Sequence, residues 1–157
     1  MRLSQLQQQL AELRDNLGDH QQTAEFHQRI VMLHSSISGI ANACDNVPDC
    51  QCAPKLADIV IQIVSFPSQF PDWGDIWGSQ EWEDFHVDKL FGDIWDHLYK
   101  LHQLTAGIVG GRSDIILLYK MIQVCRSLSQ LLGIDLQEAV SERLDTVSSH
   151  PPQNLVL

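Results

Sequence analysis

Basic residues are scarce in this chain of 157 residues, which has 10 Lys and Arg against 20 Asp and Glu, a formal charge of −10. A surface with that balance repels phosphate backbones and anionic lipid headgroups. We therefore expect no nucleic-acid partner and no membrane partner, and a nucleotide would need divalent cations to bridge the charges. No window holds 18 uncharged apolar residues, so no transmembrane helix is expected.

Several familiar signals are also missing. The opening MRLSQLQQQLAELRDNL lacks the apolar segment of a secretory signal. Without one, four cysteines are typical of reduced thiols, and we expect a cytoplasmic protein. There is no HExxH, no GxSxG and no Gly-rich phosphate loop. Hydrophobic residues still make up 44% and charged residues 19%, which predicts one folded domain over 1–157.

Apolar residues recur at helical spacing through the first half of the chain. Leucines at positions 3, 6, 10, 13 and 17 form a seam on a helix over 1–18, which we expect to pack on the body of the protein or on a second copy. A stripe from Phe26 to Ile40 predicts a helix over 23–43 with Thr23 as its N-cap. KLADIVIQIVSF predicts a helix ended by Pro67. These two helices form a first pair over 23–70.

The second half repeats this organisation after a connector over 71–84. The connector carries three of the four tryptophans, which we expect to pack on the core, with a base-stacking pocket as the alternative. Helices are predicted over 83–109 ended by Gly110-Gly111, over about 113–132 ended by Gly133, and from Asp135 with a capping box. The fold class is therefore an all-α bundle of about six helices, with a second pair and a closing helix over 85–150.

An internal repeat relates the two pairs. Leu33-His34 and Gly39-Ile40 match Leu101-His102 and Gly107-Ile108 at an offset of 68 residues, and Asp58 matches Asp114 at an offset of 56. These matches predict two helix pairs that arose by duplication and pack as a four-helix bundle.

Three stretches resemble the all-α NTP pyrophosphohydrolases of the MazG-like group. HSSISGI at 34–40 resembles the family's first motif, of ExxE type, and KLADIVIQI at 55–63 resembles its ExxD helix. LGIDLQEAV at 132–140 resembles its closing helix. The resemblance implies a helical bundle in which four carboxylates on two facing helices hold Mg²⁺, and in which a nucleoside triphosphate is hydrolysed with release of pyrophosphate.

The chain departs from the family pattern at the carboxylates themselves. Ser36, Gly39 and Lys55 stand where the family has glutamates, and Asp58 alone remains in the first pair. Asp114 is the acid kept in the second pair. One carboxylate per site holds Mg²⁺ poorly, and a lysine repels it.

The candidate site residues follow from this resemblance and from charge spacing. Asp58 and Asp114 are the candidate metal ligands, joined by Asp93 and Asp96, which are three residues apart and can share a cation. Further acids on the same expected helix are Glu83, Asp84 and Asp88. Lys55 and His34 are the candidates for contact with the substrate. The alternative for the acids is a solvated face.

Two functions therefore stay open. The first is a pyrophosphohydrolase-related protein with weak or lost Mg²⁺-dependent activity, and the second is a non-catalytic helical protein that forms a homo-oligomer or binds a protein partner. A zinc site at Cys44, Cys50 and Cys52 has unusual spacing, so incidental thiols are the favoured interpretation. A disulfide in this loop requires an oxidising setting.

Overall fold

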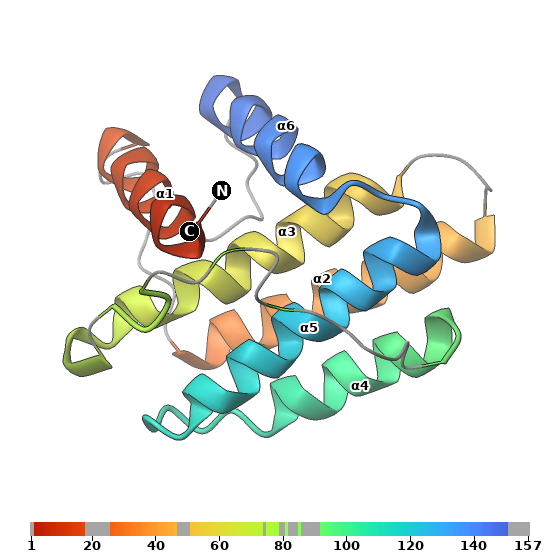
Figure 1. Cartoon of the computed structure of the whole chain (residues 1–157), viewed down its shortest axis with the longest axis horizontal. Coiled ribbons are helices and arrows are strands. Elements are labelled where there is room, and N and C mark those ends of the chain that lie inside the picture. The colour runs from red at the N-terminus through yellow and green to blue at the C-terminus, as the bar shows by residue number, and fades with distance from the viewer. Residues whose placement is uncertain are drawn as a thin grey trace.

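The computed structural model describes residues 2–17, 26–46, 51–73, 75–78, 81, 85 and 92–150. These residues form six α-helices and two short 3₁₀ helices, and the described part of the chain contains no strand beyond an isolated bridge between Arg2 and Glu81. The helices are α1 (Leu3–Leu17), α2 (Phe26–Asn46), α3 (Cys52–Ser65), η2 (Phe66–Gln69), η3 (Pro71–Trp73), α4 (Ile94–Ala106), α5 (Asp114–Leu132) and α6 (Leu136–Ser149). The predicted all-α bundle is confirmed (Figure 1).

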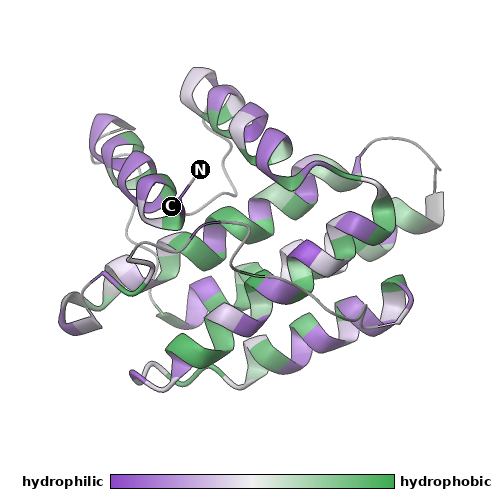
Figure 2. Ribbon diagram, viewed as in Figure 1, coloured by the Kyte–Doolittle hydropathy of each residue, from purple (hydrophilic) through white to green (hydrophobic). Residues whose placement is uncertain are grey.

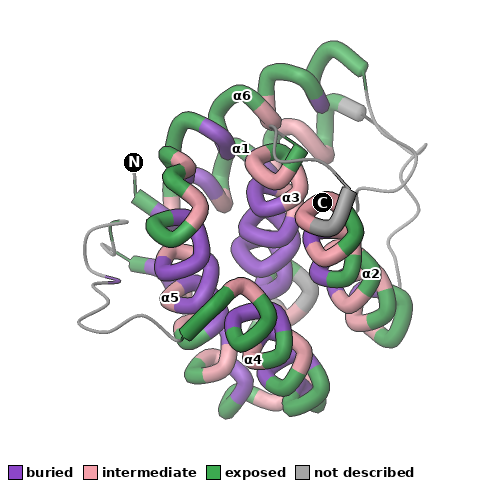
Figure 3. The backbone as a smooth tube through the Cα atoms, turned by 90° about the vertical axis from the view of Figure 1, so that its right-hand side faces the viewer, coloured by how far each residue is buried: buried purple, intermediate pink, exposed green. Residues whose placement is uncertain are grey.

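Helix α3 is the centre of the fold. It packs against α2 and α5, and also against α1 and α6, which lie together on one side of it (Figure 1). From Leu56 to Ser65 every residue except Asp58 is buried, so α3 is apolar and enclosed on nearly all sides (Figures 2 and 3). A helix that is apolar around most of its circumference needs neighbours on every side, and α3 has them. Asp58 is therefore the one residue in this buried stretch of α3 that is partly exposed.

The four central helices, α2 to α5, pack as two related helix pairs. Helix α2 packs on α3 and α4 packs on α5, while α2 also contacts α4 and α3 also contacts α5. In an arrangement with two-fold pseudo-symmetry, equivalent residues near the axis meet each other. His34 of α2 and His102 of α4, which are equivalent in the predicted repeat, stack at a centroid distance of 5.0 Å. This contact agrees with the predicted duplication.

The leucine seam of α1 packs on the body of the protein. Leu3, Leu6 and Leu10 are at most 2% exposed, and Leu13 packs against the same core. Burying a leucine side chain contributes about 1.5–3 kcal/mol. The seam therefore packs within the chain, which is the first of the two roles expected for it.

Two helix boundaries differ from the prediction in the second half. The helix predicted over 83–109 is wrong at both ends, because α4 begins only at Ile94 and ends at Ala106. Gly92 has a φ of +106° and Asp93 is extended, so the chain turns sharply into α4. Gly107 is the C-cap, whereas Gly110 and Gly111 lie beyond the helix in the connection to α5.

Other boundaries agree more closely with the sequence. Helix α2 runs three residues past the predicted end at 43, and Thr23 lies outside the described residues. Gly133 ends α5 in the left-handed conformation with a φ of +68°, as predicted for a glycine stop. Asp135 is the N-cap of α6, where its side chain accepts the Glu138 N–H at 3.0 Å.

Tryptophans of the connector enter the core. Trp77 is fully buried, its indole Nε1–H donates to the Val64 carbonyl at 3.2 Å, and its ring contacts Tyr119. Trp73 is 7% exposed and stacks on Phe70. Two of the three connector tryptophans thus anchor the segment, while Trp82 lies outside the described residues.

Helix α5 is long and apolar enough to cross a membrane by length and composition, with a mean hydropathy of 1.3 over its best window. Its buried residues include Leu118, Met121, Ile122 and Leu128, which belong to the core. Core helices of water-soluble bundles meet the same criterion.

Candidate functional site

The positions that the resemblance aligns with MazG-like carboxylates lie on α2 and α3, which pack against each other. Gln62 of α3 donates its side-chain N–H to Ser36 Oγ at 2.7 Å. A Cβ placed on Gly39 would lie 3.6 Å from Nζ of Lys55. The helix pair therefore brings positions 36 and 39 against α3, but with neutral and basic groups in place of acids.

Asp58 is held by an arginine. Arg143 of α6 donates from Nε to Asp58 Oδ1 at 2.6 Å and from Nη2 to Oδ2 at 3.1 Å. The two side chains are only 22% and 20% exposed. Two parallel charge-assisted hydrogen bonds use both carboxylate oxygens and compensate their charge. Asp58 therefore serves as a contact between α3 and α6.

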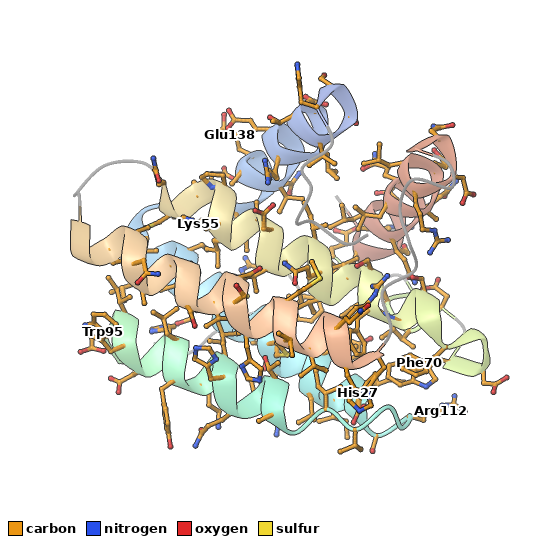
Figure 4. All side chains as sticks on the ribbon, turned by 180° about the vertical axis from the view of Figure 1, so that it is seen from behind. His27, Lys55, Phe70, Trp95, Arg112 and Glu138 are labelled. Atoms are coloured by element: carbon orange, nitrogen blue, oxygen red, sulfur yellow. The ribbon has the colours of Figure 1, made fainter. Side chains whose placement is uncertain are left out.

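Lys55 lies one turn before Asp58, near the start of α3, toward the same end of the bundle as Trp95 (Figure 4). Lys55 and Arg143 both carry a positive charge, and each disfavours a metal cation beside Asp58.

Asp114 is buried at 1% exposure and binds backbone groups. Its Oδ2 accepts the N–H groups of Val109 at 3.1 Å, Gly110 at 2.7 Å and Gly111 at 3.1 Å. Gly110 adopts a φ of +86°, a conformation that glycine takes at little cost. The carboxylate thus fixes the connection between α4 and α5, where it satisfies three donors that would otherwise lack helical partners.

Asp93 and Asp96 cap the start of α4. The Asp93 carboxylate accepts the Asp96 N–H at 2.9 Å, and the Asp96 carboxylate accepts the Asp93 N–H at 3.1 Å. This reciprocal capping box satisfies two donors at the helix start. The two acids whose spacing predicted a shared cation therefore cap the helix. The other acids in that prediction, Glu83, Asp84 and Asp88, lie outside the described residues.

The candidate metal ligands are thus distributed over three places in the fold. Among the residues that the structure describes, no group of three or more His, Cys, Asp or Glu side chains is placed to hold a metal ion. Asp58, Asp114, Asp93 and Asp96 each have a protein partner for their carboxylates. The geometry of these four residues fits structural roles and does not fit a Mg²⁺ site.

His34, a candidate for substrate contact, pairs instead with His102. The two Nδ1 atoms are 2.8 Å apart, and the rings are nearly parallel at 15°. One imidazole must donate and the other must accept, so at most one of the facing nitrogens carries a proton. Burial and the neighbouring His34 lower the pKa of His102, which favours the neutral form of the His102 ring.

Arg29 was not among the candidate site residues predicted from the sequence. It is 5% exposed on the inner side of α2, and Nη1 donates to Ser65 Oγ at 3.4 Å. Burial and the charge of Arg14 lower the pKa of Arg29 to about 10. It lines a narrow crevice together with Met32, Leu33, Gln62 and Phe66. The available signal was its position within the apolar stripe, four residues before Leu33.

No family model, curated protein or solved structure matches this chain. The resemblance to the MazG-like group rests on the three stretches of the chain alone.

Proposed function

We propose that this chain is a non-catalytic relative of the MazG-like pyrophosphohydrolases, which keeps a helical bundle for binding and has lost the magnesium site. The observation that carries the proposal is the bidentate contact between Asp58 and Arg143. It occupies the acid that the family pattern retains in the first helix pair.

The surroundings of Asp58 support the same conclusion. Magnesium prefers an octahedron of oxygen ligands and is usually held by one or two carboxylates plus phosphate oxygens. Here Ser36 and Gln62 bond to each other, and Lys55 adds a positive charge. A metal would have to break the ion pair and lie beside two cations.

Calorimetry with Mg²⁺ and a panel of deoxynucleoside triphosphates tests the loss of the site, in parallel with an assay for pyrophosphate release. We expect no Mg²⁺-dependent heat and no release above buffer. Magnesium-dependent release of pyrophosphate by the wild-type chain would overturn the proposal.

Residual hydrolysis is the second candidate, supported by the three family-like stretches. It requires Arg143 to move away so that Asp58 becomes available to a metal. In that case Asp58→Ala and Asp114→Ala would each abolish pyrophosphate release. Activity that survives both substitutions would place the chemistry elsewhere on the chain.

The binding surface that we propose is the outer face of α4. Trp95 is 52% exposed and Tyr99, one turn later, is 66% exposed. Large aromatic side chains of this kind are enriched at protein interfaces. Because the α1 seam is already buried internally, a homo-oligomer would have to form through another apolar face such as this one.

Light scattering tests this surface. We expect the wild-type chain to have a mass above that of a monomer, and Trp95→Ser with Tyr99→Ser to reduce it to one chain. Val109→Ser is the matched control, because Val109 is apolar and 74% exposed but lies outside α4. A monomeric wild-type chain, or an unchanged mass in the double variant, would contradict the proposed oligomer.

A further inference from the structure

Two cysteines meet where α2 ends and α3 begins. Sγ of Cys44 and Sγ of Cys52 are 3.4 Å apart, and both side chains are half-buried. Cys44 is two residues before the end of α2, and Cys52 is the first residue of α3. The intervening residues 47–50 lie outside the described part of the chain.

The packing of the two helices holds the sulfur atoms near each other. Cys44 packs against the hydrophobic core, as does Ala53, the neighbour of Cys52. Helices α2 and α3 are also packed directly against each other. The proximity of the thiols therefore follows from the helix pair.

The separation is close to what a disulfide requires. A disulfide bond is about 2.05 Å long, so the two sulfur atoms would have to approach by about 1.3 Å. Rotation of two partly exposed side chains can supply a shift of that size with the helices in place.

We propose that Cys44 and Cys52 form a reversible dithiol–disulfide site that reacts with small-molecule disulfides such as glutathione disulfide. One protein thiolate attacks the disulfide and forms a mixed disulfide, releasing one molecule of the small thiol. The second protein thiolate then attacks the protein sulfur of the mixed disulfide, which forms the Cys44–Cys52 bond and releases the second small thiol. Two protein thiols are oxidised and one small disulfide is reduced to two thiols.

Cys125 does not take part in this exchange. It is fully buried in α5, and burial raises the pKa of its thiol well above the usual range. A buried thiol of this kind is inert because the thiolate is the reactive form. Cys125 is therefore the internal control.

Oxidation would link the end of α2 to the start of α3, close to Lys55. Closing so short a loop constrains the unfolded chain, and such a bond raises Tm of a chain of this size by roughly 5–10 °C. The site is independent of the proposed loss of catalysis, since it uses no residue of the metal site.

The test uses the folded chain of 157 residues in buffers of defined reduced to oxidised glutathione ratio, followed by alkylation and peptide mass mapping. We expect the loss of two hydrogens per chain, a linked peptide that joins Cys44 to Cys52, and reversal by a dithiol reductant. Cys44→Ser and Cys52→Ser should each lose the bond and retain one glutathione adduct. Cys50→Ser and Cys125→Ser should retain the bond.

Three results would overturn the proposal. These are stable glutathione adducts on both thiols without an internal bond, a wild-type linkage that involves Cys50, and a bond that forms only in denaturant. Since the wild-type chain alone yields all three readouts, the test does not depend on how well a serine variant folds. Circular dichroism of each variant reports its helix content.

Discussion

At the scale of single residues, Asp58 is the half-buried acid in a run of α3 that is otherwise enclosed. Its partner Arg143 is 85 residues away in the sequence. No local pattern relates the two, because an ion pair between separate helices depends on how the helices pack. The sequence therefore identified Asp58 as a notable acid and predicted a metal ligand there, but it gave no sign of the contact with Arg143.

A double-mutant cycle measures this contact. We expect Asp58→Asn and Arg143→Met each to lower the free energy of unfolding, with a coupling of roughly 1–2 kcal/mol, since the pair is bidentate and partly buried. Urea denaturation gives the four stabilities. The exposed pair of Arg2 and Glu81 is the matched control, with an expected coupling below about 0.5 kcal/mol. Equal coupling in both cycles would contradict a structural role for Asp58.

His102 predicts a dependence of stability on pH. Its pKa is lowered in the folded chain, so the unfolded state binds more protons below a pH of about 6.5. The stabilisation by neutral His102 is therefore present above that pH and is lost as the pH falls through the lowered pKa. Urea midpoints measured from pH 8 to pH 5 should decrease.

The His102→Gln variant should show a smaller decrease over that range. The exposed His150 provides the matched control, and His150→Gln should follow the wild-type curve. The same slope in wild type and His102→Gln would contradict the lowered pKa of His102.

At the scale of the helices, the hydrophobic periodicity predicted the existence of each helix better than its ends. The spacing of leucines in α1 and the apolar run of α3 clearly predicted two helices, because these faces had to be buried. The start of α4 was missed because the signal lay in Gly92 and in two aspartates that favoured a different interpretation. At the start of α4, the D-x-x-D pattern that follows a glycine forms the helix cap.

The capping box of α4 gives a prediction at this scale. Asp93→Ala should lower the free energy of unfolding by about 1 kcal/mol. Asp93→Asn should retain most of the wild-type stability, because asparagine also caps helices. Thermal unfolding with and without Mg²⁺ measures both effects. A cap predicts the same Tm in either buffer, while stabilisation of the wild type by Mg²⁺ that disappears in Asp93→Ala would indicate a cation site.

The seam of α1 gives a second prediction. Leu6 is fully buried against the body of the protein, so Leu6→Ala should cost about 2–4 kcal/mol of stability through lost burial and a cavity. Leu13 is only partly buried, and Leu13→Ala should cost clearly less. Chemical denaturation compares the two. Similar small effects would mean that α1 contributes little to the core.

At the scale of the whole molecule, the two helix pairs and the closing helix decide what the bundle can do. The periodicity and the repeat predicted the all-α class, and the repeat placed His34 and His102 in matching positions. The environment of each acid could not be predicted from the sequence, because Asp114 is held by backbone donors and Asp58 by α6. Residues matched in the predicted repeat can therefore have different partners.

A restored site would show whether the bundle still has the geometry of a metal-binding relative. Gly39 has room for a side chain, because its nearest neighbour would be Lys55 Nζ at ordinary contact distance. The restoring substitutions are Ser36→Glu, Gly39→Glu, Lys55→Glu and Arg143→Ala. A variant with all four presents four carboxylates, including Asp58, across α2 and α3.

Titration of Mg²⁺ by calorimetry into the wild type, Asp58→Asn and this restored variant is the most direct test. We predict no binding heat for the wild type or for Asp58→Asn, and saturable binding for the restored variant. Saturable Mg²⁺ binding by the wild type that Asp58→Asn abolishes would contradict the proposed loss of the magnesium site.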